Sequence, residues 1–521
     1  MAVLGISAGF HDAAVSVVDS RGKITFAGHA ERYSKLKNDK DLNRAILEEA
    51  VSSTNETISA IGWYEKPWLK HTRQVYSGEK SLLSMPLSPR KYLRSIVGKD
   101  LDTVPIRTFG HHLTHAAAGF QTSNYGTAIC VVVDAIGEWD CFSFWLAWYD
   151  DGKPQYKKLH SIKYPHSLGL FYSAITEACG LKPNEEEYIT MGMAAFGNPH
   201  NWAARIVRES FDASHNEDNG ILQFKSTLNF HAGMPDNIIT PDMSKEDIAA
   251  AGQYAVETTI RKVFGYALNL SIHYGTNNFV YMGGVALNCK ANTAVINRVI
   301  NNPHTITTHN TRRLWTMPNP GDAGSSLGAA ALLHGGPVKW ENAFLGTNIP
   351  GKYPVRELVK ILKSEAIVGV ASGRAEFGPR ALGNRSLLAD PRGEHIKDDV
   401  NNIKRRQKYR PFSPVIMEEY VSDYFDCGLT PNFQYMQSLG ILKSKYMNDF
   451  RAIMHVDGSA RIQTVSKDDD SGMRDLLEQW YFWSGGCPML LNTSLNIRGE
   501  PMVNDRIDAD RFTQKYGVKV L

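Results

Sequence analysis

The stretch GISAGFHDAAVSVVDSRGK, residues 5–23, indicates how the chain begins to fold. Its pattern predicts a strand, a polar turn that contains glycine, a second strand, and a turn that ends in Gly-Lys. The stretch VVDAIGEWDCFSFWLAWYDDGK, residues 132–153, has the same order of features. Two such units predict an internal duplication, and a chance match between two short segments is the alternative.

The repeated unit also indicates a fold class. We expect strands over residues 3–7, 14–19 and 24–27, and again over 128–134 and 142–149. A strand–turn–strand unit with Gly and Asp at the turn resembles the start of each half of the actin/sugar-kinase/heat-shock ATPase fold. The glycines of such a turn let backbone N–H groups approach a phosphate closely.

The composition excludes several classes of protein. The chain has 521 residues, of which 43% are hydrophobic and 21% charged, with a net charge of +3. This length allows two to four domains, and the composition is not that of a disordered chain. No stretch approaches the ~20 apolar residues of a membrane span, so we expect no membrane insertion. The start lacks a signal-peptide pattern and the six cysteines form no CxxC pair, so we expect a cytoplasmic protein.

Helical and strand patterns continue along the chain. Helices are expected over residues 248–274 and 291–300, with a short strand over 278–282 between them. The stretch 335–351 is rich in Gly and Pro without strong periodicity, which indicates a linker or domain boundary. A second α/β unit follows, with a helix over 355–364 and a strand over 367–371.

The histidines of HHLTHAAA are the sharpest local feature. His111 and His115 are four residues apart, so on a helix they share one face and could chelate one metal ion. Asp134 ends an apolar strand, and Asp322 opens the expected helix 325–333. Two His with two Asp form a ligand set suited to Fe, Mn or Zn. The alternatives are a surface helix with three histidines and, for Asp322, a helix N-cap.

Two glycine-rich segments suit a nucleotide. MGGVALN at 282–288 and MGMAAFG at 191–197 would let a backbone approach a ligand, although tight packing needs glycine just as often. The C-terminal third also has an anion-binding pattern, with Arg374, Arg380 and Arg385 in Gly-rich loops. The run KRRQKYR at 404–410 fits either an anion site or a solvated charged face.

Together these segments resemble the ATP-dependent O-carbamoyltransferases of the nodulation-protein, cephem and tobramycin type. The resemblance runs nearly end to end, through FHDAAVSVVD, AERYSKLK, HHLTHAAAGF, VVVDAIGEW, HSLGLFYSAIT, MGMAAFG, GGVALNCKAN, PNPGDAGSSLGAA, GRAEFGPRALGNRSLLADPR, YRPFSP and LNTSLNIRGEP. It implies an α/β protein with an ATPase-like transfer domain, residues 1–345. The second domain, residues 346–521, would be like the enzyme that makes threonylcarbamoyl-adenylate.

The resemblance implies a two-step reaction. The C-terminal domain would use ATP, with Mg²⁺ as a candidate cation, and carbamoyl phosphate to form carbamoyl-adenylate. The phosphate and carbamoyl groups would be held by Lys404, Arg410, Asn492, Ser494 and Arg498. A hydroxyl of the acceptor would then attack the carbamoyl carbon, and AMP would leave. A homodimer is compatible with the resemblance.

For the N-terminal domain the resemblance implies an iron site, or one for Mn²⁺ or Zn²⁺, that acts as a Lewis acid. Its ligands would be His111, His115, Asp134 and Asp322. His11 would lie close to the transferring carbamoyl group, as a hydrogen-bond donor or a general base. The resemblance also implies an adenosine-binding turn formed by Gly283, Gly284 and Asn288. It implies a basic loop near the acceptor that contains Lys35 and Lys37.

Two positions depart from the family pattern. Tyr188-Ile189 stand where the family usually has Gly-Lys, so a nucleotide contact from that lysine is absent or supplied elsewhere. Asn38 occupies a position that is commonly His, which puts the acceptor-side loop in doubt.

The acceptor itself is not fixed by these motifs. Between residues 66 and 99 the basic residues Lys66, Lys70, Arg73, Lys80, Arg90, Lys91, Arg94 and Lys99 face one acid, Glu79, with Trp68, Tyr76 and Tyr92 among them. This pattern allows a polyanionic acceptor such as hydroxymethylcytosine in DNA, with the base flipped out. A solvated basic face, with a small hydroxylated acceptor, is the alternative. A tRNA threonylcarbamoyl-type enzyme and a sugar-kinase-like phosphotransferase are the rival functions.

Overall fold

The computed structural model describes residues 1–521 except 79–87, 213–222, 226, 302–310, 394 and 428–432. The chain divides into two compact units. The first comprises residues 1–25 and 40–340, and the second comprises residues 26–39 and 341–521. Glu79 and Lys80 of the basic segment lie outside the described residues.

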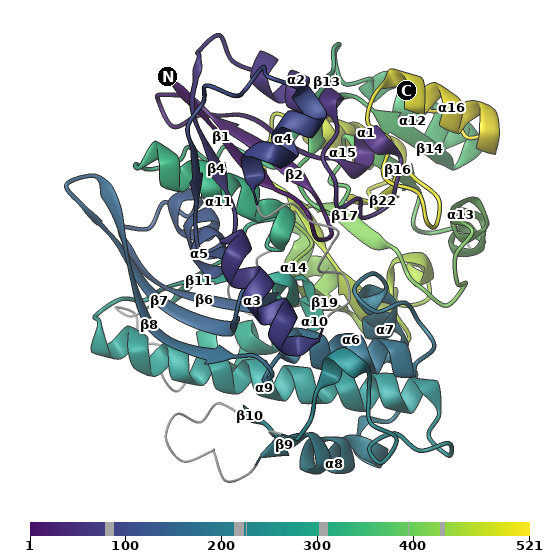
Figure 1. Cartoon of the computed structure of the whole chain (residues 1–521). Coiled ribbons are helices and arrows are strands. Elements are labelled where there is room, and N and C mark those ends of the chain that lie inside the picture. Colours follow the sequence, from purple (N-terminus) through teal and green to yellow (C-terminus); the bar gives the residue numbers. More distant parts are fainter. Residues whose placement is uncertain (79–87, 213–222, 226, 302–310, 394, 428–432) are drawn as a thin grey trace. The chain divides into compact units, whose positions relative to one another are not determined.

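The N-terminal part contains two five-stranded sheets (Figure 1). The first sheet has the order β3-β2-β1-β4-β5, with β1 (Ala2–Ser7), β2 (Ala14–Val18), β3 (Ile24–His29), β4 (Ile58–Trp63) and β5 (Ile106–Thr108). The second has the order β8-β7-β6-β11-β12, with β6 (Thr127–Gly137), β7 (Asp140–Asp150), β8 (Lys153–Lys163), β11 (Asn278–Met282) and β12 (Arg313–Trp315). In the first sheet β1 pairs antiparallel with β2 and parallel with β4. In the second sheet β6 pairs antiparallel with β7 and parallel with β11. The predicted duplication and the ATPase-like fold class are therefore confirmed by strand order and direction.

Helices α5 (His111–Thr122) and α11 (Asp322–His334) pack against each other and against the sheets. α11 contacts β1, β2 and β4, whereas α5 contacts β6 and β11. Two glycines permit this close packing. A Cβ on Gly5 of β1 would lie 1.9 Å from the carbonyl oxygen of Ser326, and one on Gly328 of α11 would lie 1.8 Å from that of Thr114. The packing brings the start of α5 to the start of α11.

The first unit also contains other helices, some of which contribute many buried residues to its core. They are α2 (Arg44–Ser52), α3 (Pro67–Ser77), α4 (Pro89–Val97), α6 (Leu168–Ala178), α7 (Glu187–Met193), α8 (Pro199–Ser210), α9 (Lys245–His273) and α10 (Cys289–Val295), with the two-residue strands β9 (Phe211–Asp212) and β10 (Gln223–Phe224). The expected helix 248–274 is confirmed as α9, which runs along the sheet of β6–β8 (Figure 1). The expected helix 291–300 is instead α10 followed by a π-helical turn, Ile296–Ile300.

The second unit is built on the sheet β14-β16-β22-β17-β21. Its strands are β14 (Ile367–Ala371), β16 (Arg385–Ala389), β17 (Ser413–Met417), β21 (Gln463–Val465) and β22 (Met489–Ser494), with β13 (Phe344–Ile349) paired to β15 (Gly373–Glu376) and a small sheet of β18 (Phe425–Asp426), β19 (Leu439–Leu442) and β20 (Ser459–Arg461). The helices are α1 (Glu31–Ser34), α12 (Val355–Glu365), α13 (Ile396–Lys404), α14 (Val421–Tyr424), α15 (Met473–Trp483) and α16 (Arg506–Tyr516). α12 and α15 cover one apolar face of the sheet.

The expectation of a linker over 335–351 is wrong for its last third. Residues 344–349 form β13, whose Leu345 and Ile349 side chains are buried. The strand is short, and because glycines and prolines lie on both sides of it the stretch as a whole has the composition of a loop.

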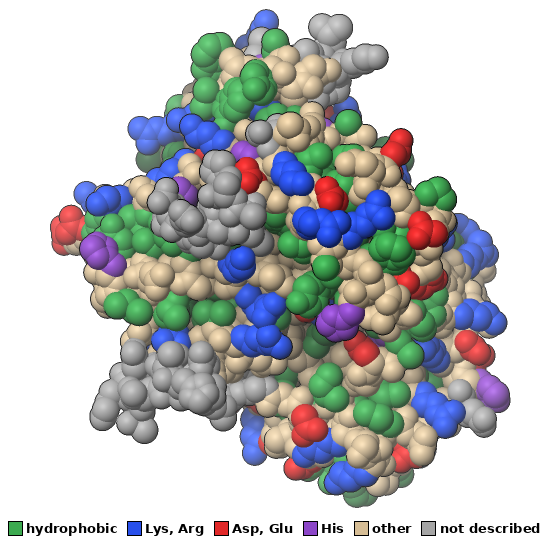
Figure 2. Space-filling view, turned by 90° about the horizontal axis from the view of Figure 1, so that it is seen from below, with side chains coloured by type: hydrophobic (Ala, Val, Ile, Leu, Met, Phe, Trp, Pro, Cys, Tyr) green, Lys and Arg blue, Asp and Glu red, His purple; other side chains and the backbone are tan. Residues whose placement is uncertain are grey.

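Figure 2 shows one face of the molecule, on which Lys and Arg side chains are scattered among acidic and apolar ones. None of the helices in the described ranges combines the length and the apolar character that a bilayer crossing requires.

Candidate functional site

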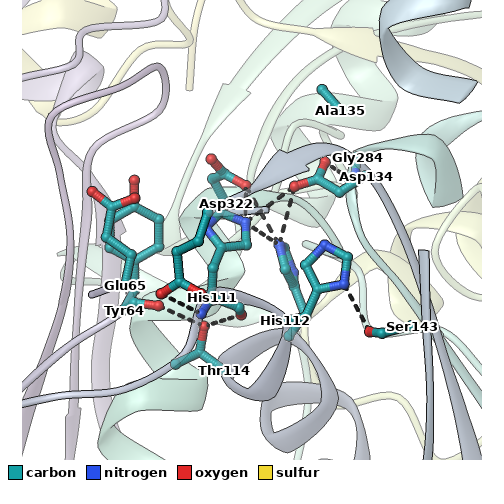
Figure 3. Close-up of polar contacts among 12 residues, drawn as sticks. Tyr64, Glu65, His111, His112, Thr114, Asp134, Ala135, Ser143, Gly284 and Asp322 are labelled. Atoms are coloured by element: carbon teal, nitrogen blue, oxygen red, sulfur yellow. Dashed lines mark hydrogen bonds and ion pairs between the residues drawn. The ribbon is translucent and has the colours of Figure 1, made fainter. Parts of the chain in front are cut away.

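Four side chains of the first unit converge on one point (Figure 3). His111 and His115 come from α5, Asp134 from β6 and Asp322 from α11. Their ligand atoms all lie within 4.8 Å of one another. His111 Nε2 is 3.1 Å from His115 Nε2, 3.1 Å from Asp134 Oδ2 and 3.3 Å from Asp322 Oδ1. All four residues are buried.

Local structure explains this convergence and overturns two alternatives. The histidines lie one helical turn apart at the start of α5 and are 2% and 0% exposed, so a surface helix is wrong. The N-cap of α11 is Gly321, and no side chain caps that helix. Asp322 is therefore not an N-cap, and its carboxylate points at the histidines instead.

The donor set fits a divalent cation. Each histidine Nε2 lies 3.1–3.6 Å from a carboxylate oxygen of Asp134 and of Asp322, and such a set of N and O donors suits Fe, Mn or Zn. Two buried carboxylates also need compensating charge. Burial lowers the pKa of His111, but Asp322 and Asp134 more than offset it and hold that pKa well above its usual value. The same attraction keeps the pKa of Asp134 and Asp322 low, against the effect of burial.

Backbone groups of the turn after β11 hold Asp134 in place. Gly284 N donates to Asp134 Oδ1 at 3.0 Å, which leaves Oδ2 to face the histidines. Gly283 has φ +96°, and a Cβ there would lie 2.1 Å from the carbonyl oxygen of Val133. These glycines were predicted to bind adenosine; the contact that the structure shows is with the end of β6.

Asn288, the third predicted adenosine contact, is occupied within the protein. Its Oδ1 caps α10 by accepting from Ala291 N, and its amide pairs with the amide of Gln253 at 2.9 and 3.1 Å. The other glycine-rich segment, MGMAAFG at 191–197, begins in a helix, because residues 191–193 belong to α7.

His11 lies in the turn between β1 and β2. Its Nδ1 is 3.3 Å from Asp12 Oδ2, and its ring lies 4.4 Å from that of the half-exposed Phe10. Burial lowers the pKa of His11, but the hydrogen bond and charge of Asp12, with the charges of Asp322 and Asp134, raise it to about 9. His11 is therefore within electrostatic reach of two of the four clustered residues.

Several groups beside the cluster were missed from the sequence. The ring of Tyr64 packs on His111 at 5.2 Å, with Glu65 next to it (Figure 3). The carboxylate of Glu65 pairs with Lys70 at 2.9 Å. Glu138 accepts from the backbone N–H of His111 at 3.3 Å. Tyr64 and Glu65 directly follow β4, and this position at the carboxyl end of a parallel strand is the signal that could have found them.

The basic segment 66–99 does not present its charges as a group. Lys70 and Arg73 are buried. Arg90 donates to the carbonyl oxygens of Asp102 and Val104, and Arg94 pairs with the Asp102 carboxylate at 2.7 Å. Of the described basic residues in the segment, Lys66, Lys91, Arg94 and Lys99 are exposed, and Arg94 is held by its ion pair with Asp102.

In the second unit the side chain of Lys404 is buried. Its Nζ donates to Ser494 O at 2.5 Å, Ser494 Oγ at 3.0 Å and Asn496 Oδ1 at 2.6 Å. No carboxylate pairs with it among the residues that the structure describes. Burial lowers the pKa of Lys404 well below its usual value, and the charges of Arg406, Arg410 and Lys37 lower it further. Lys404 is therefore not part of a solvated charged face.

The predicted anion-binding residues gather around this lysine. Ser494 contacts Lys404 directly, and the positive charge of Arg410 lowers the pKa of Lys404. The backbone N–H of Arg498 donates to the Lys404 carbonyl oxygen at 3.0 Å. Asn492 lies two residues before Ser494 on β22, on the same face of the sheet. A concentration of positive charge with neutral hydrogen-bonding groups suits an anionic ligand.

Arg385 does not belong to this set. It is fully buried, and its guanidinium donates to the carbonyl oxygens of Asn504, Ser372, Gly373, Asn384 and Thr347. Arg374 likewise donates to Leu345 O and Gly346 O. The interpretation of Arg385 as an anion-binding residue is wrong, because its donors hold loops of the second unit together.

The basic loop 35–37 is also engaged. Lys35 pairs with Asp508, and Lys37 pairs with Glu31 at 3.2 Å. Asn38, which departs from the family pattern, donates its backbone N–H to the same Glu31 at 2.9 Å. These contacts lie within the second unit, where Lys37 is close enough to affect Lys404.

Comparison with known proteins identifies the family. Residues 2–331 match the family described as "Carbamoyltransferase N-terminus", and residues 359–521 match "Carbamoyltransferase C-terminus". The chain belongs to the carbamoyltransferase family. It is a carbamoyltransferase, which confirms the family resemblance seen in the sequence.

The relatives described next cover 77–98% of this carbamoyltransferase chain. Nodulation protein NolNO of Sinorhizobium fredii is 27% identical over 96% of this chain and 76% of its own length. Nodulation protein NolO of Bradyrhizobium diazoefficiens is 30% identical over 77% and 75%. The uncharacterized protein sll1178 of Synechocystis is 30% identical over 98% and 93%.

Solved structures are more distant. HypF of T. kodakarensis is 14% identical with a TM-score of 0.33, over 64% of this chain and 47% of that one. A ROK family glucokinase from Streptomyces griseus is 11% identical with a TM-score of 0.31, over 64% and 99%.

Proposed function

We propose that this carbamoyltransferase works in two steps, with the first at the Lys404 site of the second unit. Carbamoyl phosphate, ATP and water would give carbamoyl-adenylate, phosphate and pyrophosphate. The observation that carries this proposal is the buried amino group of Lys404, which has no carboxylate partner in the described chain. The charged form of such a group is costly unless an anion compensates it, and depressed lysine pKa values mark functional sites.

The second step is assigned to the cluster of the first unit. An acceptor hydroxyl would attack the carbamoyl carbon of the adenylate, and AMP would leave with the bridging oxygen. His111, His115, Asp134 and Asp322 would hold a divalent cation, with Fe²⁺ preferred over Mn²⁺ or Zn²⁺ on the family resemblance. When bound, the cation supplies Lewis acidity for the carbonyl and phosphate oxygens.

His11 is assigned to the reacting hydroxyl or carbonyl. Its raised pKa favours the imidazolium, which donates a hydrogen bond to a developing oxyanion. A cation held by Asp134 and Asp322 would offset their charges and lower this pKa, which suits a general base. Both roles require His11 within about 3 Å of the reacting atoms.

For the acceptor we favour a small hydroxylated molecule over a DNA base. Phosphate-backbone binding needs several free cations, and Lys70, Arg73, Arg90 and Arg94 are buried or bonded within the protein. The exposed aromatic residues of α3, Trp68 and Tyr76, remain available for stacking on an acceptor ring.

Product analysis tests the two-step scheme. The chain would be incubated with ATP and labelled carbamoyl phosphate, and the nucleotides would be separated. AMP with pyrophosphate supports adenylation, whereas ADP alone would indicate a sugar-kinase-like phosphotransferase. Products that appear only with threonine and bicarbonate would indicate a threonylcarbamoyl-type enzyme. A panel of hydroxylated metabolites and hydroxymethylcytosine DNA, read by the mass of one added carbamoyl group, then identifies the acceptor.

A further inference from the structure

One face of the β16–β22 pair carries polar side chains at the end nearest Lys404. Ser386 lies directly opposite Ser494, and Asn492 lies opposite Ser413 of β17. Directly opposed residues of antiparallel strands share a face, and so do residues two apart on one strand. Ser386, Asn492 and Ser494 are therefore neighbours on one surface, and Lys404 Nζ contacts the last of them at 3.0 Å.

Two oxygen atoms on this surface lack hydrogen-bond partners. Ser386 is 0% exposed and Asn492 is 1% exposed. Within the described part of the chain, neither Ser386 Oγ nor Asn492 Oδ1 has a partner. A buried polar atom left without a partner costs roughly 1–3 kcal/mol, so such atoms call for an explanation.

The orientation of the Asn492 amide is fixed by a chain of hydrogen bonds. Leu382 O can only accept, so the atom of Gln463 that faces it at 2.7 Å must be Nε2. The Oε1 atom of Gln463 then faces Asn492 at 2.7 Å, which must present Nδ2. The same Nδ2 donates to Ala381 O at 3.1 Å. Reversing either amide would place oxygen against oxygen, so Asn492 Oδ1 is held as an unused acceptor.

An unused acceptor on the same face as Ser494, which contacts Lys404, favours a particular ligand. An amide NH₂ group donates two hydrogen bonds, whereas a methyl group of the same size donates none. A hydroxyl such as that of Ser386 can either donate to a carbonyl oxygen or accept from an N–H group. A ligand that joins a phosphate to a carbamoyl group matches this arrangement, with the phosphate toward Lys404 and the NH₂ toward Asn492 Oδ1.

We propose that Ser386 and Asn492 Oδ1, the latter oriented by Gln463, recognise the carbamoyl NH₂ and so exclude acetyl phosphate as a donor. This inference rests on the proposed use of carbamoyl phosphate at the Lys404 site. Ser386 and Asn492 contact the ligand, and Gln463 is a positioning residue. A site built to hydrogen-bond a group rejects analogues that lack it by factors of up to about 10⁴, because the buried partner is left unpaired.

Calorimetric titration of the full chain tests the proposal, with carbamoyl phosphate, acetyl phosphate and inorganic phosphate as ligands. The wild type is expected to bind carbamoyl phosphate at least about 100-fold more tightly than acetyl phosphate. Gln463→Met keeps the length of the side chain but frees the Asn492 amide to rotate. It is expected to reduce this preference about tenfold or more while leaving the affinity for inorganic phosphate unchanged.

Ser386→Ala adds a readout that a structural role would not give. Because Ser386 Oγ has no partner among the residues that the structure describes, its removal is expected to leave Tm unchanged or raise it. The affinity for carbamoyl phosphate is expected to fall several-fold, and that for acetyl phosphate to stay the same. Thr464→Val, next to Gln463 on the other face of β21, is the control and is expected to change neither.

The outcomes separate this inference from the proposed function. Equal affinity of the wild type for carbamoyl and acetyl phosphate would overturn the recognition of NH₂ but leave adenylation in place. A wild type that binds inorganic phosphate but not carbamoyl phosphate would overturn the proposed function itself. A loss of Tm in Ser386→Ala without a change in the preference would show that the hydroxyl serves the fold.

Discussion

The Nε2 atoms of His111 and His115 lie 3.1 Å apart, and each faces a carboxylate oxygen of Asp134 and of Asp322. Two ring nitrogens this close, with two carboxylates, form a compact ligand set. A cation at their centre would satisfy all four groups at once.

Replacing His111 with alanine should separate the two steps. We expect carbamoyl transfer to fall at least about 100-fold, because one ligand of the cluster is lost, and AMP and pyrophosphate formation to continue. Metal content by mass spectrometry should fall in parallel. His273→Ala, at the exposed end of α9, is the matched control. Loss of both steps would mean that His111 supports the fold instead.

Gly283→Ala should destabilise the first unit strongly. A residue with φ +96° whose Cβ lies 2.1 Å from Val133 O is both strained and blocked. We expect a loss of about 3 kcal/mol or more in the free energy of unfolding, measured by chemical denaturation. Gly275→Ala isolates the strain, since φ is +66° there but no atom lies within 4 Å of the Cβ. It should cost only about 1 kcal/mol. Equal costs at the two positions would contradict the close contact with β6.

Carbamoyl phosphate should bind with uptake of a proton. The pKa of Lys404 is well below its usual value in the free protein, mainly through burial, and a bound phosphate would raise it again. At any pH between these two values Lys404 is partly neutral before binding and charged afterwards. Calorimetry in buffers of different ionisation enthalpy measures this uptake, which should disappear in Lys404→Met along with most of the affinity. Uptake of the same size in that variant would assign the proton elsewhere.

Replacing Glu419 should weaken the second unit at neutral pH but not in acid. Arg474 makes paired hydrogen bonds to it at 2.8 and 2.6 Å and lowers the pKa of Glu419 to about 2, against a small opposing effect of burial. A depressed carboxyl pKa stabilises the folded state above about pH 4.5, and this contribution is lost as the pH falls toward 2. After allowing for partial exposure we expect Glu419→Gln to cost about 1–2 kcal/mol at pH 7.

Denaturation of Glu419→Gln and wild type at pH 7, 5 and 3 checks this expectation. The difference between them should shrink at pH 3, and the exposed Glu365→Gln should match the wild type throughout. A difference that stays constant down to pH 3 would rule out the ion pair as its cause.

The sequence allowed the duplicated strands and the His–Asp cluster to be predicted, because both depend on short regular spacings. Short apolar runs bounded by polar turns mark β1, β2, β6 and β7, and the spacing of His111 and His115 is set by one helical turn. Long motifs shared with the carbamoyltransferase family supplied Asp134, Asp322 and the Lys404 site.

Other features depend on tertiary contacts and could not be predicted in this way. Nothing in the local sequence says that the donors of Arg385 end on five carbonyl oxygens, or that Lys70 pairs with Glu65. The pairing of Asn288 with Gln253 and the orientation of Asn492 by Gln463 likewise join residues 29–35 positions apart.

Residues 26–39 belong to the second unit although they lie near the start of the chain. Arg32 donates to Gly378 O, Tyr33 bonds Thr347 and Lys35 pairs with Asp508. The second unit is thus a discontinuous domain formed by two separate stretches of the chain, and cleavage at one position cannot separate it intact from the first unit. A fragment that starts at residue 346 would lack these three contacts. Gene fusions or exchanges that swap only the C-terminal half between relatives would have to carry this N-terminal stretch with them.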